Sequence, residues 1–189
     1  MDINQPVPTI YGSHVDQYSE LWTRQITALR SQFASAIEEV RLPREYPTDV
    51  PILYVRKEFI VQILRALKET SGMDYQFLAD ITATDEEVSP RFEVIYNLFS
   101  HVSKARIRLK VRVNEGDSVP TSVNLWLAAN WAEREVFDMY GVAFDGHPDL
   151  RRILMDERWQ GHPLRKDYPL RGYQIFPDTV PANEALLKD

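Results

Sequence analysis

Cysteine is absent from all 189 residues of this chain. Its absence excludes disulfide bonds, iron–sulfur clusters held by thiolates, cysteine-ligated zinc and a cysteine nucleophile. The chain also lacks any apolar run of the roughly 20 residues that cross a bilayer as a helix. Its first residues show neither the basic, apolar pattern of a signal peptide nor the arginine-rich pattern of a transit peptide. From these absences we expect a soluble, intracellular protein.

Basic residues are fewer than acidic residues. The chain has 22 lysines and arginines against 28 aspartates and glutamates, which gives a net charge of −6 at pH 7. Because nucleic-acid binders usually carry a basic stripe, this balance argues against that class of function. Glycine-rich phosphate loops, nucleotide-binding fingerprints and Ser/His/Asp signatures are absent too. The length fits one domain with appendages, since domains commonly run to roughly 100–200 residues.

Two helices are predicted in the first part of the chain. Apolar residues at intervals of three to five predict an amphipathic helix over residues 16–33, with Ser13 or Asp16 as its N-cap. A second apolar stripe predicts a helix from Phe59 to Leu67, with Gly72 at its C′ position.

The strands complete the predicted fold of the first domain, which we place at residues 1–122 with a loose lead-in over 1–12. Runs of β-branched and aromatic residues predict five strands, at 36–42, 52–55, 75–84, 91–99 and 106–113. The order of helices and strands predicts an α+β fold. We expect a two-layer sandwich, in which a mixed five-stranded sheet carries its helices on one side.

The predicted strand over 106–113 alternates strictly between apolar and basic residues. Such alternation places one face on a core and the other toward solvent. The outward face then carries four cations, Arg106, Arg108, Lys110 and Arg112. Two interpretations remain open: pairing with acids on a neighbouring strand, such as Glu93, or a surface that binds an acidic partner.

Residues 123–189 are predicted to form an extension that begins with a highly charged helix. Asn130 is the predicted N-cap, with Glu133 at N3 in a capping box, and Gly141 ends the helix. Glu133 also falls within the apolar arc, so the alternative is a partly buried carboxylate that must be paired or hydrogen-bonded. Trp131 shares the opposite arc with three charged residues, Arg134, Glu135 and Asp138. An exposed aromatic residue among charges is typical of the centre of a protein interface.

The tripeptide Gly-His-Pro occurs twice in the long loop that follows, at residues 146–148 and 161–163. Two histidines invite a metal site, and His147 and His162 would then need ligands such as Asp145, Asp149 and Asp167. No helical spacing fixes the two imidazoles together, however. The favoured interpretation is a pair of rigid turns, built on glycine and proline, that direct basic residues toward carboxylates nearby or on a partner. These basic residues are Arg151, Arg152, Arg158, Arg165, Lys166 and Arg171.

The motif NWAEREVFDMYG at Asn130–Gly141, followed by GHPDLRRIL and GHPLRKDYPLRGY, resembles the 30-kDa subunit of respiratory complex I. In bacteria this is the C subunit of the NADH-quinone oxidoreductase. The resemblance covers about residues 126–173, and the chain departs from the usual family tail after Tyr173.

This resemblance implies a hydrophilic subunit of the peripheral arm of a proton-translocating NADH:quinone oxidoreductase. It implies a chain that binds no NADH, FMN, iron–sulfur cluster or quinone itself, and has no catalytic role of its own. It also implies a partner, the homologue of the 49-kDa subunit, which is the D subunit in bacteria. The implied location is the cytoplasmic side of the bacterial inner membrane. A scaffold subunit of a related membrane-bound hydrogenase complex, or a stand-alone His/Asp metalloenzyme, are the alternatives.

The residues expected at the interface with a partner come from the charged helix and from the loop. They are Trp131, Glu133, Arg134, Glu135, Asp138, His147, Arg151, Arg152, His162, Arg165, Lys166 and Asp167. We expect that reversing Arg151 and Arg152 to glutamate blocks assembly while the isolated chain stays folded.

Overall fold

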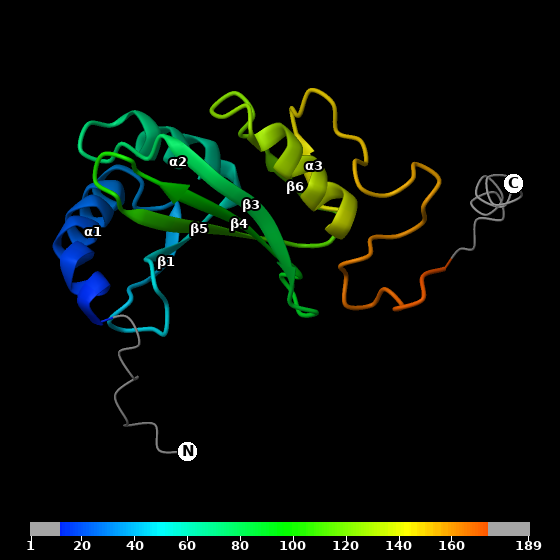
Figure 1. Cartoon of the computed structure of the whole chain (residues 1–189), viewed down its shortest axis with the longest axis horizontal. Coiled ribbons are helices and arrows are strands. Elements are labelled where there is room, and N and C mark those ends of the chain that lie inside the picture. The colour runs from blue at the N-terminus through cyan, green and yellow to red at the C-terminus, as the bar shows by residue number, and fades with distance from the viewer. Residues whose placement is uncertain (1–11, 174–189) are drawn as a thin grey trace, which may run out of the picture.

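The computed structural model describes residues 12–173 (Figure 1). The predicted lead-in, apart from its last residue, and the tail after Tyr173 lie outside the described residues. The helices are α1 (Gly12–Gln32), η1 (Lys57–Phe59, a 3-10 turn), α2 (Ile60–Glu69) and α3 (Ala129–Tyr140). The strands are β1 (Ile37–Arg41), β2 (Ile52–Val55), β3 (Phe77–Asp85), β4 (Phe92–Phe99), β5 (Arg106–Val113), β6 (Ser118–Pro120) and β7 (Ala143–Asp145).

The five predicted strands form one mixed sheet in the order β1-β2-β5-β4-β3. Only the β2–β5 pair is parallel, and the other three pairs are antiparallel. The two parallel strands are joined by α2 and by the β3–β4 hairpin, which together provide the long crossover that a parallel pair needs. This architecture confirms the predicted fold class.

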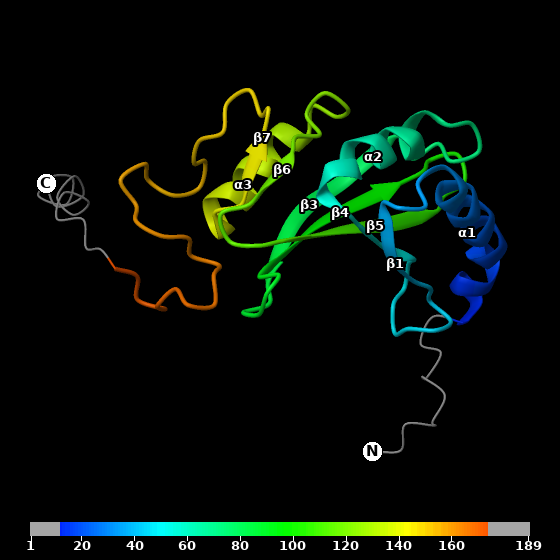
Figure 2. The same ribbon diagram turned by 180° about the vertical axis from the view of Figure 1, so that it is seen from behind.

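All three helices bury apolar side chains in one core on the same face of the sheet. Trp22 of α1, Leu64 of α2 and Val136 of α3 belong to this core, and each is almost completely buried. Burying a side chain of this size contributes about 1.5–3 kcal/mol. Figure 2 shows α2 and α3 over the strands from behind. Trp126, which follows the predicted domain boundary at residue 122, packs in the same core. The residues on the two sides of that boundary therefore share one hydrophobic core.

The other face of the sheet carries no helix of the described residues, and we call it the open face (Figure 1). Here the pairing interpretation is confirmed for two of the four cations of β5. Lys110 Nζ lies 2.6 Å from a carboxylate oxygen of Glu93, and Arg112 Nη2 lies 3.1 Å from one of Glu39.

Three local expectations differ from the structure. Helix α1 begins at Gly12, four residues before the predicted start. Helix α2 ends at Glu69, and Thr70 after it is extended, so Gly72 is not at C′ but in the turn beyond, where its φ of +85° favours glycine. The parallel pair β6–β7 was not predicted, because strands of three residues are too short to show an alternating pattern.

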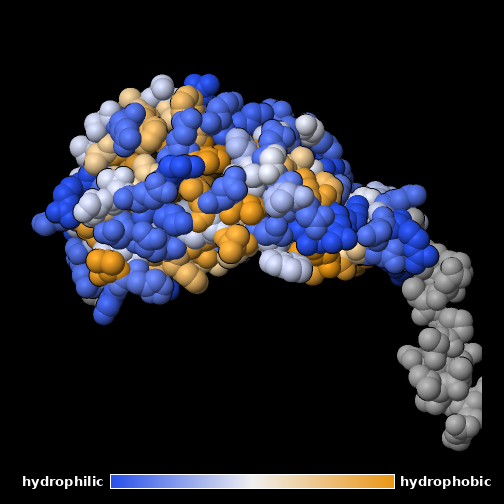
Figure 3. Space-filling view, turned by 90° about the horizontal axis from the view of Figure 1, so that it is seen from above, coloured by the Kyte–Doolittle hydropathy of each residue, from blue (hydrophilic) through white to orange (hydrophobic). Residues whose placement is uncertain are grey.

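Within residues 12–173, no helix is both long enough and apolar enough to cross a membrane. Figure 3 looks down on the helix-covered side. Hydrophilic residues occupy most of this surface, with smaller hydrophobic areas between them.

Candidate docking site around helix α3

Glu133 does not cap α3. The helix begins at Ala129, and Ala128 before it makes no capping hydrogen bond through its side chain. Glu133 is instead fully buried, and its carboxylate accepts three hydrogen bonds. The Ser122 backbone N–H and hydroxyl each donate to Oε1 at 2.7 Å, and the Thr121 hydroxyl donates to Oε2 at 2.5 Å. The capping-box prediction was therefore wrong, and the alternative of a buried, hydrogen-bonded carboxylate is confirmed.

Asp138 lies five residues further along the helix and is also fully buried. Its Oδ1 accepts a hydrogen bond from Arg152 Nη1 at 2.7 Å. Its Oδ2 accepts three more, from the successive backbone N–H groups of Ile153, Leu154 and Met155 at 3.1, 2.8 and 2.9 Å. Burial alone would raise the pKa of Asp138, but these donors outweigh it and hold the pKa below its ordinary value. Asp138 therefore fixes the loop over residues 152–155 as a charged acceptor.

Arg134 binds the same loop from the helix side. Its Nε donates to the carbonyl of Arg151 at 3.0 Å and its Nη2 to the carbonyl of Arg152 at 3.2 Å. Its guanidinium also lies 5.1 Å from the ring centroid of Trp131. The charged arc that the helical wheel placed opposite the core is thus partly covered by the chain's own loop. This covering could not be read from the helix sequence, because it depends on where a later segment returns.

The second Gly-His-Pro segment caps the C-terminal end of α3. The last four carbonyls of an α-helix have no partner within the helix, and here each carbonyl from Phe137 to Tyr140 receives a donor. In that order, the donors are Gly141 N at 2.8 Å, His162 Nδ1 at 3.0 Å, Leu164 N at 3.1 Å and Arg165 Nε at 2.6 Å. The cation of Arg165 also suits the negative end of the helix dipole. Burial, with the nearby cations of Arg165 and Arg152, lowers the pKa of His162, so the neutral ring donates through Nδ1.

The first Gly-His-Pro segment contacts the opposite end of α3. The Asp149 backbone N–H donates to His147 Nδ1 at 3.0 Å, so the ring proton sits on Nε2, which donates to the carbonyl of Asn130 at 3.1 Å. The helix carbonyls of residues 130 and 138 are about 12 Å apart at 1.5 Å per residue. The structure therefore does not bring His147 and His162 together. Among the residues it describes, no three His, Asp or Glu side chains are grouped to hold a metal ion.

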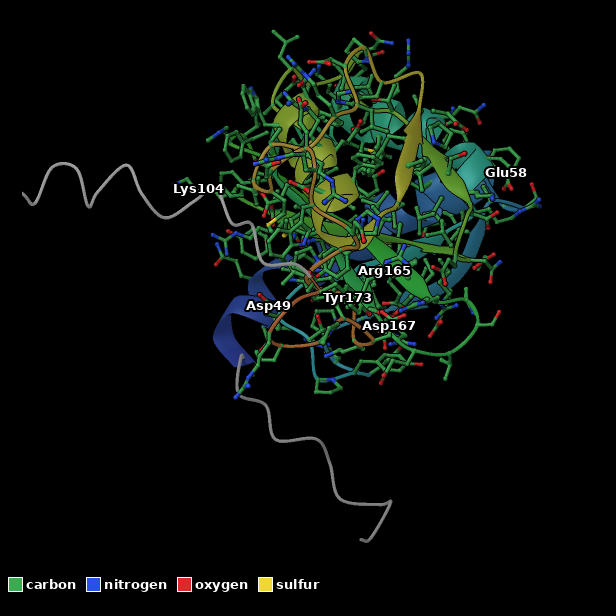
Figure 4. All side chains as sticks on the ribbon, turned by 90° about the vertical axis from the view of Figure 1, so that its right-hand side faces the viewer. Asp49, Glu58, Lys104, Arg165, Asp167 and Tyr173 are labelled. Carbon is green, nitrogen blue, oxygen red and sulfur yellow. The ribbon has the colours of Figure 1, made fainter. Side chains whose placement is uncertain are left out.

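An ion network joins the extension to the sheet. At its centre is Arg91, whose guanidinium lies within 3.0 Å of carboxylate oxygens of Asp85, Glu115 and Asp167. Arg165 reaches Glu115 at 2.5 Å, and the Lys166 backbone N–H donates to Asp85 at 3.0 Å. Figure 4 shows Arg165 and Asp167 close to one another below α3. The network secures the loop beyond the second Gly-His-Pro to the β3–β4 hairpin and to the turn after β5.

Low pH should weaken this ion network by protonating Asp85. Burial would raise the pKa of its carboxyl, but Arg91 and two backbone N–H groups lower it to about 2. The stabilising contribution of a carboxylate with a depressed pKa is complete above its unfolded pKa of about 4, and is lost as pH falls through the folded value. We expect the difference in free energy of unfolding between the wild type and Asp85→Asn to shrink by about 2 kcal/mol from pH 5 to pH 2. Urea titrations at several pH values measure it, and a constant difference would contradict the assignment.

The predicted interface residues therefore divide into two groups. Glu133, Asp138 and Arg134 are buried, and Arg152, Arg165 and both histidines make hydrogen bonds within the chain. The residues that stay exposed are Trp131, Glu135, Arg151, Lys166 and Asp167. Their contact with a partner remains a prediction.

Sequence reasoning missed the residues that receive the buried charges of α3. Thr121 and Ser122 bind Glu133. It also missed Arg91 and Asp85, which bind the loop beyond the second Gly-His-Pro. The adjacent hydroxyls of Thr121 and Ser122 were a possible signal for a partner of a buried acid, since buried carboxylates need donors. The three backbone N–H groups on Asp138 give no signal in the sequence.

Residues 53–174 match the family described as the respiratory-chain NADH dehydrogenase 30-kDa subunit. The chain is 46% identical over 160 residues to the C subunit of the NADH-quinone oxidoreductase of Geotalea uraniireducens, covering 84% of this chain and 92% of the relative. It is 47% identical over 161 residues to the protein of the same name from Geobacter sulfurreducens, covering 84% and 93%. Among solved structures, a chain of the membrane-bound sulfane sulfur reductase, an archaeal respiratory membrane complex, is similar with a TM-score of 0.66. That likeness has 25% sequence identity and covers 79% of this chain and 86% of the other.

Proposed function

Because the chain belongs to the family of the respiratory-chain NADH dehydrogenase 30-kDa subunit, we propose that it is a structural subunit of the peripheral arm of a proton-translocating NADH:quinone oxidoreductase. Relatives named as the C subunit of an NADH-quinone oxidoreductase support this, since the match extends over more than nine tenths of their length. The complex then transfers electrons from NADH to quinone, and this chain supports that reaction by holding other subunits in place.

In this proposal the chain binds no redox centre. A chain without cysteine has no thiolates to hold an iron–sulfur cluster. The histidines that first suggested a metal site are hydrogen-bonded to backbone groups at the two ends of α3. NADH, FMN, the clusters and quinone belong to other subunits.

The docking surface is the exposed side of α3 with the loop that covers it. Trp131 is the main support for this assignment, because it is 65% exposed although the nearby charges of Glu133 and Arg134 are buried. Leu127, in the turn before α3, and Leu154 in the covering loop are also exposed. Exposed apolar groups beside an arginine such as Arg151 are typical of interface hot spots. The occupant we propose is the homologue of the 49-kDa subunit, and the complex then holds the chain at the cytoplasmic side of the inner membrane.

A double substitution on this surface tests the proposal. Trp131→Ala with Arg151→Glu should reduce incorporation of the chain into the complex at least tenfold, because hot-spot truncations commonly cost about 2 kcal/mol or more. The isolated variant should lose less than about 1 kcal/mol of stability, since both side chains are exposed. Purification from membranes through a tag on another subunit, with the chain quantified by mass spectrometry, gives the stoichiometry.

Arg152 is unsuitable for this test, although the sequence suggested it. Its guanidinium holds the buried Asp138, so its reversal would unfold the loop and hide any effect on docking. A matched control is Gln62→Ala with Arg65→Glu on the exposed side of α2, which should leave incorporation unchanged. Normal incorporation of the α3 variant would overturn the docking assignment.

A second host complex has one observation in its favour, the fold likeness to a chain of the sulfane sulfur reductase complex. The same purification separates the two. Co-purification with NADH-oxidising activity supports the first proposal, whereas co-purification with a complex that lacks this activity supports the second.

A further inference from the structure

The open face of the sheet is hollowed at one end. A hollow of about 340 Å³ lies over the ends of β3, β4 and β5, and Phe77, Phe99, Arg106 and Arg108 line it. Phe77 pairs with Phe99, and Phe99 with Arg106, so these three side chains stand in one row across three strands. The guanidinium carbon of Arg106 lies 5.8 Å from the ring centroid of Phe99, and Phe77 is 49% exposed. The lining therefore combines two phenyl rings with two guanidinium groups.

The two arginines of the hollow differ from the other cations of β5. Lys110 and Arg112 are paired with carboxylates, whereas Arg106 and Arg108 have no ion pair among residues 12–173. Arg108 Nε donates to the side-chain carbonyl of Asn97 at 2.9 Å, which leaves most of its donors available. Two carboxylates, those of Asp49 and Asp80, line the same hollow without pairing to either guanidinium.

The hollow and α3 lie on opposite faces of the sheet: Val136 of α3 packs in the core, whereas the hollow opens on the open face. In Figures 1 and 2 the turn between β4 and β5, which borders the hollow, lies at the α1 end of the molecule. The loop after α3 extends toward the opposite end of the long axis in both views. A partner that binds α3 therefore leaves this end of the sheet free for another.

We propose that this hollow, bounded by Phe77, Phe99, Arg106 and Arg108, is a second docking site that takes an acidic segment of another subunit. The guanidinium fork matches a carboxylate through two parallel hydrogen bonds, and such charge-assisted bonds are about twice as strong as neutral ones. The ring of His101 contacts both phenyl rings, with centroids 5.5 Å from Phe77 and 4.9 Å from Phe99, and the exposed part of Phe77 offers an apolar contact for a side chain next to that carboxylate. The recognised segment thus presents an aspartate or glutamate beside an apolar residue. With both sites occupied, the chain binds two different subunits at once.

A membrane surface or a nucleic acid would fit less well. Both require an extended cationic area, and here two carboxylates, Asp49 and Asp80, share the hollow with the two arginines. A single carboxylate-bearing segment needs only one or two guanidiniums.

Photo-cross-linking in the assembled complex tests the inference. A benzoylphenylalanine at position 77 places the probe at the hollow, and the same probe at position 62, on the exposed side of α2, is the control. We expect position 77 to give one dominant cross-link to another subunit, mapped by mass spectrometry to a segment with an acid next to an apolar residue. Adding Arg106→Glu and Arg108→Glu should reduce its yield at least tenfold, while Arg106→Lys with Arg108→Lys should retain more of it. The isolated charge-reversal variant should keep its midpoint in urea, because both side chains are on the open face.

The inference rests on the proposed function, since the occupant is another subunit, but the two can fail separately. A chain that does not co-purify with any membrane complex overturns both. A chain that co-purifies normally, yet gives at position 77 no cross-link, a link to lipid or nucleic acid, or a link that survives the charge reversal, overturns the second site alone.

Discussion

Replacing Asp138 by alanine is expected to lower the free energy of unfolding by about 3–5 kcal/mol, a large part of the stability of an ordinary domain. The substitution leaves the guanidinium of Arg152 without its carboxylate and removes the acceptor for three successive backbone N–H groups. Urea denaturation gives the free energy. Hydrogen exchange should show that the amides of residues 153–155 lose their protection before those of the sheet.

The control lies three residues away on the same helix. Glu135 is exposed, so Glu135→Ala should change the free energy of unfolding by no more than about 0.5 kcal/mol. Asp138→Asn provides a second comparison, because it keeps the shape but replaces one acceptor oxygen with an amide group that points at donors. It should be nearly as damaging as alanine. If Asp138→Asn behaves like the wild type, the negative charge is not what holds the loop.

Gly141→Ala should cost about 3 kcal/mol. The residue has a φ of +77°, which costs a side chain about 1–2 kcal/mol. A Cβ there would lie 2.5 Å from Arg165 Nη2 and 2.6 Å from His162 Nε2, so both caps must leave the helix carbonyls that they bind. Each hydrogen bond lost contributes about 1 kcal/mol more. Chemical denaturation measures the total.

Gly116→Ala separates the backbone cost from the loss of the caps. Gly116 has a similar φ of +83°, but nothing lies within 4 Å of the position that its Cβ would take. The substitution should therefore cost only about 1 kcal/mol, the strain of the conformation itself. Equal losses for the two variants would show that His162 and Arg165 do not stabilise the end of α3.

The sheet and its helices were predictable because their patterns are local. The alternation of β5 fixed both its bounds and its buried face, and the apolar stripes of α1 and α2 identified the sides that pack on the sheet. The small β6–β7 sheet was not predictable, since its strands are brief and come from segments more than twenty residues apart.

The roles of the charged residues on α3 within the chain were not predictable from the sequence. The helix α3 carries more charged residues than exposure to solvent would explain. Its sequence therefore suggested that Arg134 and Asp138 bind a partner chain. The immediate partner is the protein's own loop, whose path is set by backbone donors that any sequence possesses. Glu133 presented the same difficulty, because a capping box and a buried acid require the same residue at the same position.

The cap on α3 also has a consequence for synthesis. Gly141 binds the Phe137 carbonyl, but the last three carbonyls of this helix, at residues 138–140, accept from residues 162, 164 and 165, more than twenty positions downstream. While the ribosome is still translating the intervening segment, α3 can form only a frayed, uncapped helix. The surface that presents Trp131 is therefore complete only once residue 165 has been synthesised and has left the ribosome. A truncated product that ends before residue 162 would then be unable to occupy the place of the complete chain, and proteases could remove it first.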